Sequence, residues 1–277
     1  MRVVARRQLR LAHVLGVLGS IADRSMASTA PAIRFLTQDE AINVDLELMQ
    51  TPGFSIDQLM ELAGLAVAGA VQEAYPLEAG FANVLVIAGP GNNGGDGLVA
   101  ARHLWHFGYT PTVVYPKRSA KPLFANLAHQ CAQLRIPLLD ALPEEFEHAH
   151  PVVLDAIFGF SFKAGSIRAP FDSIVGALRE TRVPIVSVDI PSGWDVERGN
   201  ADGLGFEPAM LVSLTAPKLC AAGFRGRHYL GGRFVPPALS DKYGLGELVS
   251  RYQGAEQCVE LTPALPPPDA KHPTSEL

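Results

Sequence analysis

A glycine-rich stretch carries the first residues whose types and spacing suit chemistry. Residues 89–97 read GPGNNGGDG and follow the apolar run VLVIA at residues 84–88. Glycines let a ligand approach the main chain, and the free N–H groups at a helix start bind phosphate. GPGNNG also has the GxGxxG spacing of dinucleotide-binding loops, although that spacing alone is a weak signal. The stretch predicts a site for a ligand that carries phosphate.

Structural interpretations of the same stretch stay open at this point. Asn92 and Asn93 are common in turns, and Asp96 is a good N-cap for a helix that starts near Leu98. In an ordinary dinucleotide-binding fold, an acid about 20 residues further on binds the ribose. Here the next apolar run ends in YPKR at residues 115–118. This difference argues against an ordinary NAD dehydrogenase.

Two carboxylates end later apolar runs. Asp155 ends the segment VVLD, and Asp189 ends IVSVD with Ser192 one turn later. An unpaired acid at a buried strand end is costly for folding, so both acids indicate a site, although Asp155 also suits a loop cap. Lys163 lies in a glycine-flanked loop after Asp155, where it either binds a ligand phosphate or is a solvated side chain.

The elements that must position these residues follow an alternating pattern of short β-branched runs and longer helical segments. Strands are expected at residues 84–88, 112–115, 152–154, 185–188, 210–214 and 233–235. Continuous apolar runs predict strands buried on both faces, as in a doubly wound α/β fold with a mostly parallel sheet. Capping boxes at Thr37 with Glu40 and at Ser55 with Gln58 predict two helix starts, the second opening a packing helix over residues 56–74. Ligands in such sheets bind outside the carboxyl ends of the strands.

Composition limits the function classes. The 277 residues are 48% apolar and 18% charged, which suits one large α/β domain with an ample core. A net charge of −5 gives no general attraction to nucleic acid, so we expect no nucleic-acid partner. Three widely separated cysteines argue against a disulfide framework or a zinc site. No apolar run reaches the roughly 18 residues of a membrane span.

The two ends differ from the middle of the chain. Residues 1–35 hold six arginines and one acid, which is typical of a mitochondrial transit peptide. A secretory signal and an untargeted flexible leader are the alternatives, and Met26 as a second start would give a cytosolic form. Residues 251–277 are expected to be a Pro-rich flexible tail, since five prolines occur in residues 262–277. The predicted organisation is therefore a leader over 1–35, one domain over 36–250 and this tail.

Five motifs in order carry a specific resemblance. NNGGDG, DAIFGFSFK, VDIPSGWDVERGN, LTAPK and YLGGRFVPP together resemble the NAD(P)H-hydrate epimerase family over about residues 36–245. The resemblance implies a Rossmann-like three-layer α/β/α sandwich with a mostly parallel central sheet. It also implies an isomerase that interconverts the R and S epimers of hydrated NADH and NADPH, binds a potassium ion and forms a homodimer.

The resemblance implies roles for particular residues. Asp189 is expected to be the acid/base residue, and Asn93, Asp155 and Ser192 are expected to ligate potassium. The expected substrate-binding residues come from the two loops that follow the first and third strands, together with the acid itself: Asn92, Asn93, Gly94, Gly95, Asp96, Gly159, Phe160, Ser161, Phe162, Lys163, Ala164, Gly165 and Asp189.

The chemistry of this substrate agrees with a single acid/base residue. The hydroxyl of hydrated nicotinamide lies on a carbon beside the ring nitrogen, so inversion needs a planar intermediate and proton transfer to and from oxygen. One positioned carboxyl, Asp189, is expected to do both. The alternatives are a non-catalytic nucleotide-binding or scaffold module of the same fold, and an oxidoreductase that uses the GxGxxG loop directly.

Overall fold

The structure is a computed structural model that describes residues 33–162 and 167–261. The chain divides into two units, Met1–Ala32 and Ile33–Leu277, and all the described residues belong to the second. Most of the expected leader, residues 1–32, and Lys163, Ala164 and Gly165 of the expected site lie outside the described residues. Within the described part of the chain, no helix is long and apolar enough to cross a membrane.

The described residues form an eight-stranded sheet in the order β3-β2-β1-β4-β5-β6-β7-β8. All neighbouring strands are parallel except β7 and β8, which are antiparallel. The strands are β1 (Asn83–Ala88), β2 (Thr110–Val114), β3 (Leu138–Leu139), β4 (Val152–Ala156), β5 (Ile185–Val188), β6 (Met210–Leu214), β7 (Arg227–Gly231) and β8 (Cys258–Glu260). The strand order reverses between β1 and β4, so the binding crevice of such a sheet is expected there.

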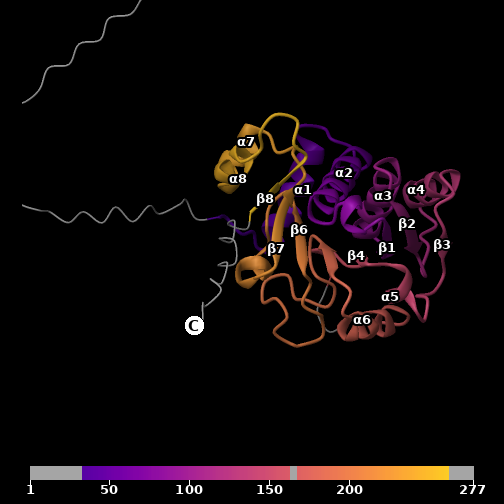
Figure 1. The fold of residues 1–277 in the computed structure, drawn as a ribbon. Helices are drawn as coiled ribbons and strands as arrows, with labels where there is room; N and C mark the ends of the chain where they lie inside the picture. Colours follow the sequence, from indigo (N-terminus) through magenta and orange to yellow (C-terminus); the bar gives the residue numbers. More distant parts are fainter. Residues whose placement is uncertain (1–32, 163–166, 262–277) are drawn as a thin grey trace, which may run out of the picture. The chain divides into compact units, whose positions relative to one another are not determined.

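Helices cover both faces of this sheet (Figure 1). They are α1 (Gln38–Gln50), α2 (Ile56–Ala74), α3 (Asn92–His106), α4 (Pro122–Gln133), α5 (Phe146–Ala149), α6 (Phe171–Glu180), α7 (Pro237–Tyr243) and α8 (Gly246–Ser250), with 3-10 turns η1 (Leu77–Ala79) and η2 (Leu219–Gly223). The largest apolar cluster joins α2, α3 and α4 to one face, and a second joins α5 and α6 to the other. The three-layer mostly parallel architecture expected from the sequence is confirmed.

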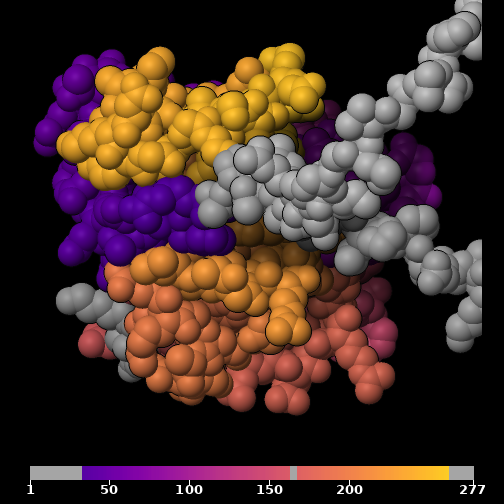
Figure 2. Space-filling model, turned by 90° about the vertical axis from the view of Figure 1, so that its left-hand side faces the viewer, coloured from indigo at the N-terminus to yellow at the C-terminus, as the bar shows by residue number. Residues whose placement is uncertain are grey.

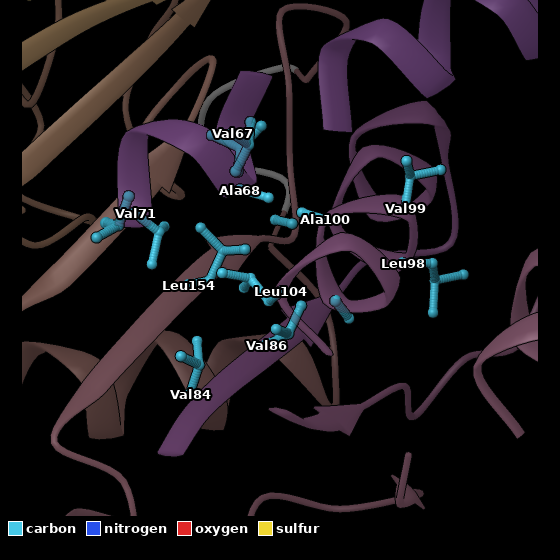
Figure 3. Close-up of a cluster of buried hydrophobic side chains, with 14 of the residues drawn as sticks. Val67, Ala68, Val71, Val84, Val86, Leu98, Val99, Ala100, Leu104 and Leu154 are labelled. Atoms are coloured by element: carbon cyan, nitrogen blue, oxygen red, sulfur yellow. The ribbon is translucent and has the colours of Figure 1, made fainter. Parts of the chain in front are cut away.

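Small side chains let α2 and α3 pack closely on the sheet. Val67 and Ala68 of α2 face Ala100 and Leu104 of α3 above strand β1, as Figure 3 shows. All four side chains are fully buried. Both predicted capping boxes are present, so Thr37 and Ser55 satisfy backbone N–H groups at the starts of α1 and α2. Helix α3 therefore packs against α2 and the sheet through fully buried side chains.

Segments far apart in the sequence meet beside the carboxyl ends of β6 and β7. Leu36 donates its backbone N–H to the Pro217 carbonyl at 2.8 Å, and Leu219 donates to the Leu36 carbonyl at 2.9 Å. Lys242 of α7 donates to Glu47 of α1 at 2.6 Å. In Figure 2 the indigo N-terminal part of this unit accordingly lies between the orange and yellow segments.

Several sequence-based boundaries need correction. The strand expected at residues 233–235 is wrong: the strand is β7, and chain reversal begins at Gly232, whose φ is 83°. Helix α3 starts at Asn92 rather than near Leu98, and its N-cap is Gly91 rather than Asp96. Strand β8 lies within the expected tail 251–277, so the folded unit continues to at least Leu261, which is buried.

Candidate active site

A cavity of about 330 Å³ opens at the carboxyl edge of the sheet. The loops after β1, β4, β5 and β6 form it together with residues of α1 and α2. Its polar lining residues are Asp45, Asn92, Asn93, Asp96, Ser161, Asp189, Thr215 and Lys218, and Met49, Met60, Phe158, Phe160, Phe162 and Phe234 are among its apolar ones. The cavity therefore adjoins the point where the strand order reverses, as expected for a ligand site in a doubly wound sheet.

The first turn of α3 borders this cavity. The first N–H groups of an α-helix have no acceptor within the helix, so this end attracts anionic groups of a ligand. A Cβ at Gly94 would overlap the Gly89 carbonyl, and one at Gly95 would overlap Met60. Gly94 and Gly95 are thus required for close packing of the helix start, and neither lines the cavity among the described residues.

Asp189 and Lys218 form a buried ion pair at the cavity wall. The Nζ atom of Lys218 donates to Asp189 Oδ1 at 2.5 Å and to the Leu214 carbonyl at 2.8 Å. The two side chains are 4% and 3% exposed, so water screens this pair very little. Lys218 Nζ also lies 5.6 Å from the centre of the Phe160 ring. The pair fixes the position of the Asp189 carboxylate at the cavity wall.

Backbone strain accompanies this ion pair. Asp189 has a φ of 64° at the end of β5, and Thr215 has a φ of 67° at the end of β6. Left-handed conformations are unfavourable for residues with a Cβ and cluster at functional sites. The backbone N–H of Asp189 donates to the Val212 carbonyl at 2.8 Å, which holds the strained residue against the sheet. Asp189 and Thr215, the two residues with this backbone conformation, both line the cavity.

Two further carboxyls share the cavity with Asp189. Burial raises the pKa of Asp96 well above its ordinary value, and the negative charges of Asp189 and Asp45 raise it further while Lys218 opposes them. Burial also raises the pKa of Asp45 to about 6, against a smaller opposing effect of Lys218. One lysine therefore faces three carboxyls, so the carboxyls cannot all be ionised at low cost.

A second polar cluster, formed by Asn93, Asp155, Ser187 and Ser192, lies next to the cavity. Asp155 is fully buried, and its carboxylate accepts from the Ser192 hydroxyl at 2.6 Å, the Ser187 hydroxyl at 2.9 Å and the Ser192 N–H at 3.0 Å. Asn93 donates to the Phe158 carbonyl at 2.9 Å, and the Phe158 N–H donates to the Ser192 hydroxyl at 3.3 Å. Hydrogen bonds thus connect the three expected potassium ligands: Ser192 bonds to Asp155 directly and to Asn93 through the backbone of Phe158.

The side-chain oxygens of this cluster are suitable ligands for a hard monovalent cation. Burial raises the pKa of Asp155, although its hydrogen bonds oppose that effect. Within the described part of the chain, no ion pair includes Asp155. Carboxylate, amide and hydroxyl oxygens are the ligands that hard cations prefer. The cluster therefore fits potassium in donor chemistry and in charge.

Most of the described residues that were expected to bind substrate line the cavity. The cavity lining includes Asn92, Asn93, Asp96, Gly159, Phe160, Ser161, Phe162 and Asp189. Sequence reasoning missed Asp45 and Lys218. Lys218 belongs to the LTAPK motif and follows an apolar run, which was an available signal. Asp45 lies in the middle of an amphipathic helix, where its spacing gives no indication that it faces a ligand site.

The fold and the cavity define a Rossmann-like α/β protein with an acid-lined pocket at the strand-order reversal. The model of the family described as YjeF-related protein N-terminus matches residues 56–220. The structure of the yeast protein YNL200c is similar at 43% identity, with a TM-score of 0.77 over 83% of this chain and 100% of that chain. The chain belongs to this family, which is that of the NAD(P)H-hydrate epimerases.

Weaker similarities extend to two other solved structures. A transhydrogenase from Sinorhizobium meliloti matches at 14% identity over 56% of this chain and 51% of that one, with a TM-score of 0.31. The eIF2B delta structure from Chaetomium thermophilum matches at 17% identity over 58% and 57%, with a TM-score of 0.33. Both TM-scores are too low for these similarities to bear on function.

Proposed function

We propose that this protein is an isomerase that interconverts the R and S epimers of hydrated NADH and NADPH. The observation that carries the proposal is the Asp189 carboxylate, held by Lys218 in a cavity beside the helix start of α3 in a chain of this family. The helix start suits the phosphates of the nucleotide, and the apolar side of the cavity suits its ring.

The reaction needs acid/base chemistry beside a planar intermediate. The hydroxyl-bearing carbon is next to the ring nitrogen, so loss of the hydroxyl as water leaves an iminium that the nitrogen lone pair stabilises. Addition of water to the opposite face then gives the other epimer. Asp189 serves as the acid/base residue, since a positioned carboxyl that exchanges protons contributes about 10²- to 10⁴-fold in rate.

Potassium belongs to this proposal as a bound ion held by Asn93, Asp155 and Ser192. When bound, it supplies positive charge that offsets the buried Asp155 carboxylate and orders the loops after β1 and β4. Asn92, which follows the first of these loops at the start of α3, and Phe160 of the second loop line the cavity. The chain's own residues perform the proton transfers.

The direct test is an epimerisation assay with one purified epimer of hydrated NADH. The protein is expected to speed its conversion to the epimer mixture, followed by chromatography, beyond the rate without protein. No net oxidation or reduction should accompany the conversion. Tight binding without faster conversion would favour a nucleotide-binding module, and net production of NAD would favour an oxidoreductase.

The ion is tested by exchanging potassium for tetramethylammonium at equal ionic strength. If Asn93 and Asp155 hold potassium, the larger cation should weaken binding of the nucleotide, measured by calorimetry, because the two loops lose their common ligand. Sodium serves as a second comparison of smaller size. An affinity that is the same in all three salts would exclude the ion from the site.

A further inference from the structure

Asp96 and Asp189 line the same cavity, but only Asp189 is bonded to a lysine there. Asp96 is 9% exposed and lines the cavity from the second turn of α3. Among the residues that the structure describes, no hydrogen bond acts on its carboxyl, and only burial and the charges of Asp189, Asp45 and Lys218 do. A buried carboxylate without a partner is costly, so the neutral acid is the favoured form.

The charges around Asp96 act in the same direction. Asp189 at the end of β5 and Asp45 on α1 are the negative groups that face it, and Lys218 is the positive one. Lys218 is already committed to Asp189 at 2.5 Å. Burial, which is the largest cause, and the two negative charges raise the pKa of Asp96 well above its ordinary value. Like-charged carboxyls in one site separate into an acid and a base in this way.

We propose that the two carboxyls, which line one cavity, divide the chemistry, with Asp96 as the acid that protonates the departing hydroxyl and Asp189 as the base that receives a proton from the incoming water. The inference rests on the proposed function and deepens it. It refines the scheme in which Asp189 alone is the acid/base residue, because Asp189 Oδ1 already accepts a hydrogen bond from Lys218, whereas no hydrogen bond acts on the Asp96 carboxyl among the described residues.

Each proton and electron pair has a defined destination in this scheme. Asp96 gives its proton to the hydroxyl oxygen, the carbon–oxygen bond breaks, and the nitrogen lone pair forms the carbon–nitrogen double bond as water leaves. A second water adds to the opposite face of that carbon, the double-bond electrons return to nitrogen, and the water's proton passes to Asp189. Solvent then takes the proton from Asp189 and returns one to Asp96.

The decisive variant is Asp96→Asn, which keeps the size and a hydrogen-bond donor but has no proton to give. We expect kcat for epimerisation to fall by about 10²- to 10⁴-fold while affinity for the nucleotide changes much less. Asp57→Asn, at an exposed position on α2 outside the cavity, is the matched control and should keep the wild-type kcat. A wild-type kcat in Asp96→Asn would overturn the assignment.

The protonation state is measured independently of activity. In the wild-type protein, ¹³C NMR of labelled aspartate carboxyls should show Asp96 titrating well above its ordinary value of 3.8. The epimerisation rate should fall as pH rises through that same value. Titration of Asp96 near 3.8 would overturn the inference even if Asp96→Asn fails to fold.

The proposed function and this inference fail in distinguishable ways. A wild-type protein that inverts neither epimer refutes the proposed function and, with it, the division of roles. A wild-type protein that inverts both epimers while Asp96→Asn does so equally fast refutes the division of roles alone.

Discussion

Among single residues, Asp189 and Lys218 form a buried ion pair, so a mutation of either one changes the stability of the protein as well as its activity. Both side chains are almost fully buried, and Lys218 has only the Leu214 carbonyl as a second acceptor among its described contacts. Removing one partner of a buried ion pair costs about 3–5 kcal/mol, whereas removing both costs far less. A loss of activity in a single variant therefore mixes chemistry with stability.

A double variant separates these two effects. Asp189→Asn is expected to lower kcat by about 10²- to 10⁴-fold and also to lower the free energy of unfolding by about 3 kcal/mol. Asp189→Asn combined with Lys218→Met should recover most of that stability and none of the activity. Urea unfolding and the epimerisation assay measure the two quantities. Recovery of activity in the double variant would show that Asp189 has only a structural role.

Asp45 is expected to lower stability at neutral pH. Its pKa rises from 3.8 in the unfolded chain to about 6 in the folded one, so between these values the folded protein binds a proton that the unfolded chain has lost. The free energy of unfolding therefore decreases as pH rises through this window. Asp45→Asn should raise it by on the order of 2 kcal/mol at pH 7.5 and by less than half of that at pH 4.5.

The exposed Asp39 on the same helix is the control for this prediction. Asp39→Asn should give no gain at either pH, since that side chain is solvated. Urea unfolding at the two pH values provides the comparison. A gain for Asp45→Asn that is equal at pH 4.5 and pH 7.5 would contradict the assigned cause.

The residues of the site were predictable from the sequence to the extent that they follow strands. Asp155 and Asp189 each end an apolar run, Asn93 follows one after a short glycine-rich stretch, and parallel topology brings such positions to one edge. Lys218 and Asp45 reach the same cavity through long-range contacts, such as the pairing of Leu36 with Lys218. Asp45 has no local signal on its helix, whereas the LTAPK motif after β6 was an available signal for Lys218 that was not assigned a role.

At the scale of elements, the contact between α2 and α3 positions Asp96. A Cβ at Gly64 of α2 would lie 2.9 Å from the Asp96 carbonyl oxygen and would overlap Val99. The helices therefore approach each other more closely than any residue but glycine allows at this point. The core that they share with β1 is the one drawn in Figure 3.

Gly64→Ala is expected to separate these two helices. Overpacking of this kind costs about 1–3 kcal/mol, and the epimerisation rate should fall as well because Asp96 moves with α3. Gly176→Ala on α6 is the matched control, since its Cβ meets no atom within 4 Å. It should raise stability by about 0.5–1 kcal/mol through helix propensity. Equal stability of the two variants in urea unfolding would contradict this account.

Elements with strong local signals were predicted correctly. Both capping boxes and the buried runs of β1, β5 and β6 were found at their positions within a few residues. The run at residues 233–235 was apolar for another reason: Phe234 and Val235 pack on the cluster of α1, α7 and α8 rather than pairing in the sheet. β8 was missed because its pairing with β7 is long-range and its three residues are too short for a periodic pattern.

At the scale of the whole molecule, the reversal of strand order accounts for the place of the cavity. The loops after β1 and β4 leave the sheet on opposite sides of this point, and the cavity is lined by both. Residues of α1 and α2 complete the cavity wall at this edge of the sheet. Topology thus provides the opening, while the long-range contacts of α1 and Lys218 provide its charge.

The arginine-rich residues 1–35 lead to a separate prediction about localisation. We propose that residues 1–35 direct the protein to mitochondria, because six arginines accompany one acid. A fluorescent reporter carrying residues 1–35 should enter mitochondria. Starting the chain at Met26 removes five of the six arginines and should abolish import. A reporter that stays in the cytosol, or is secreted, would contradict mitochondrial targeting.

The fate of the hydroxyl oxygen shows whether the protein inverts its substrate by loss and return of water. One epimer of hydrated NADH is incubated with the wild-type protein in water enriched in oxygen-18, and the product epimer is analysed by mass spectrometry early in the reaction. Loss and return of water predicts one solvent oxygen in each inverted molecule, at a rate far above that without protein. Inversion with the original oxygen retained, or no inversion at all, would contradict the account.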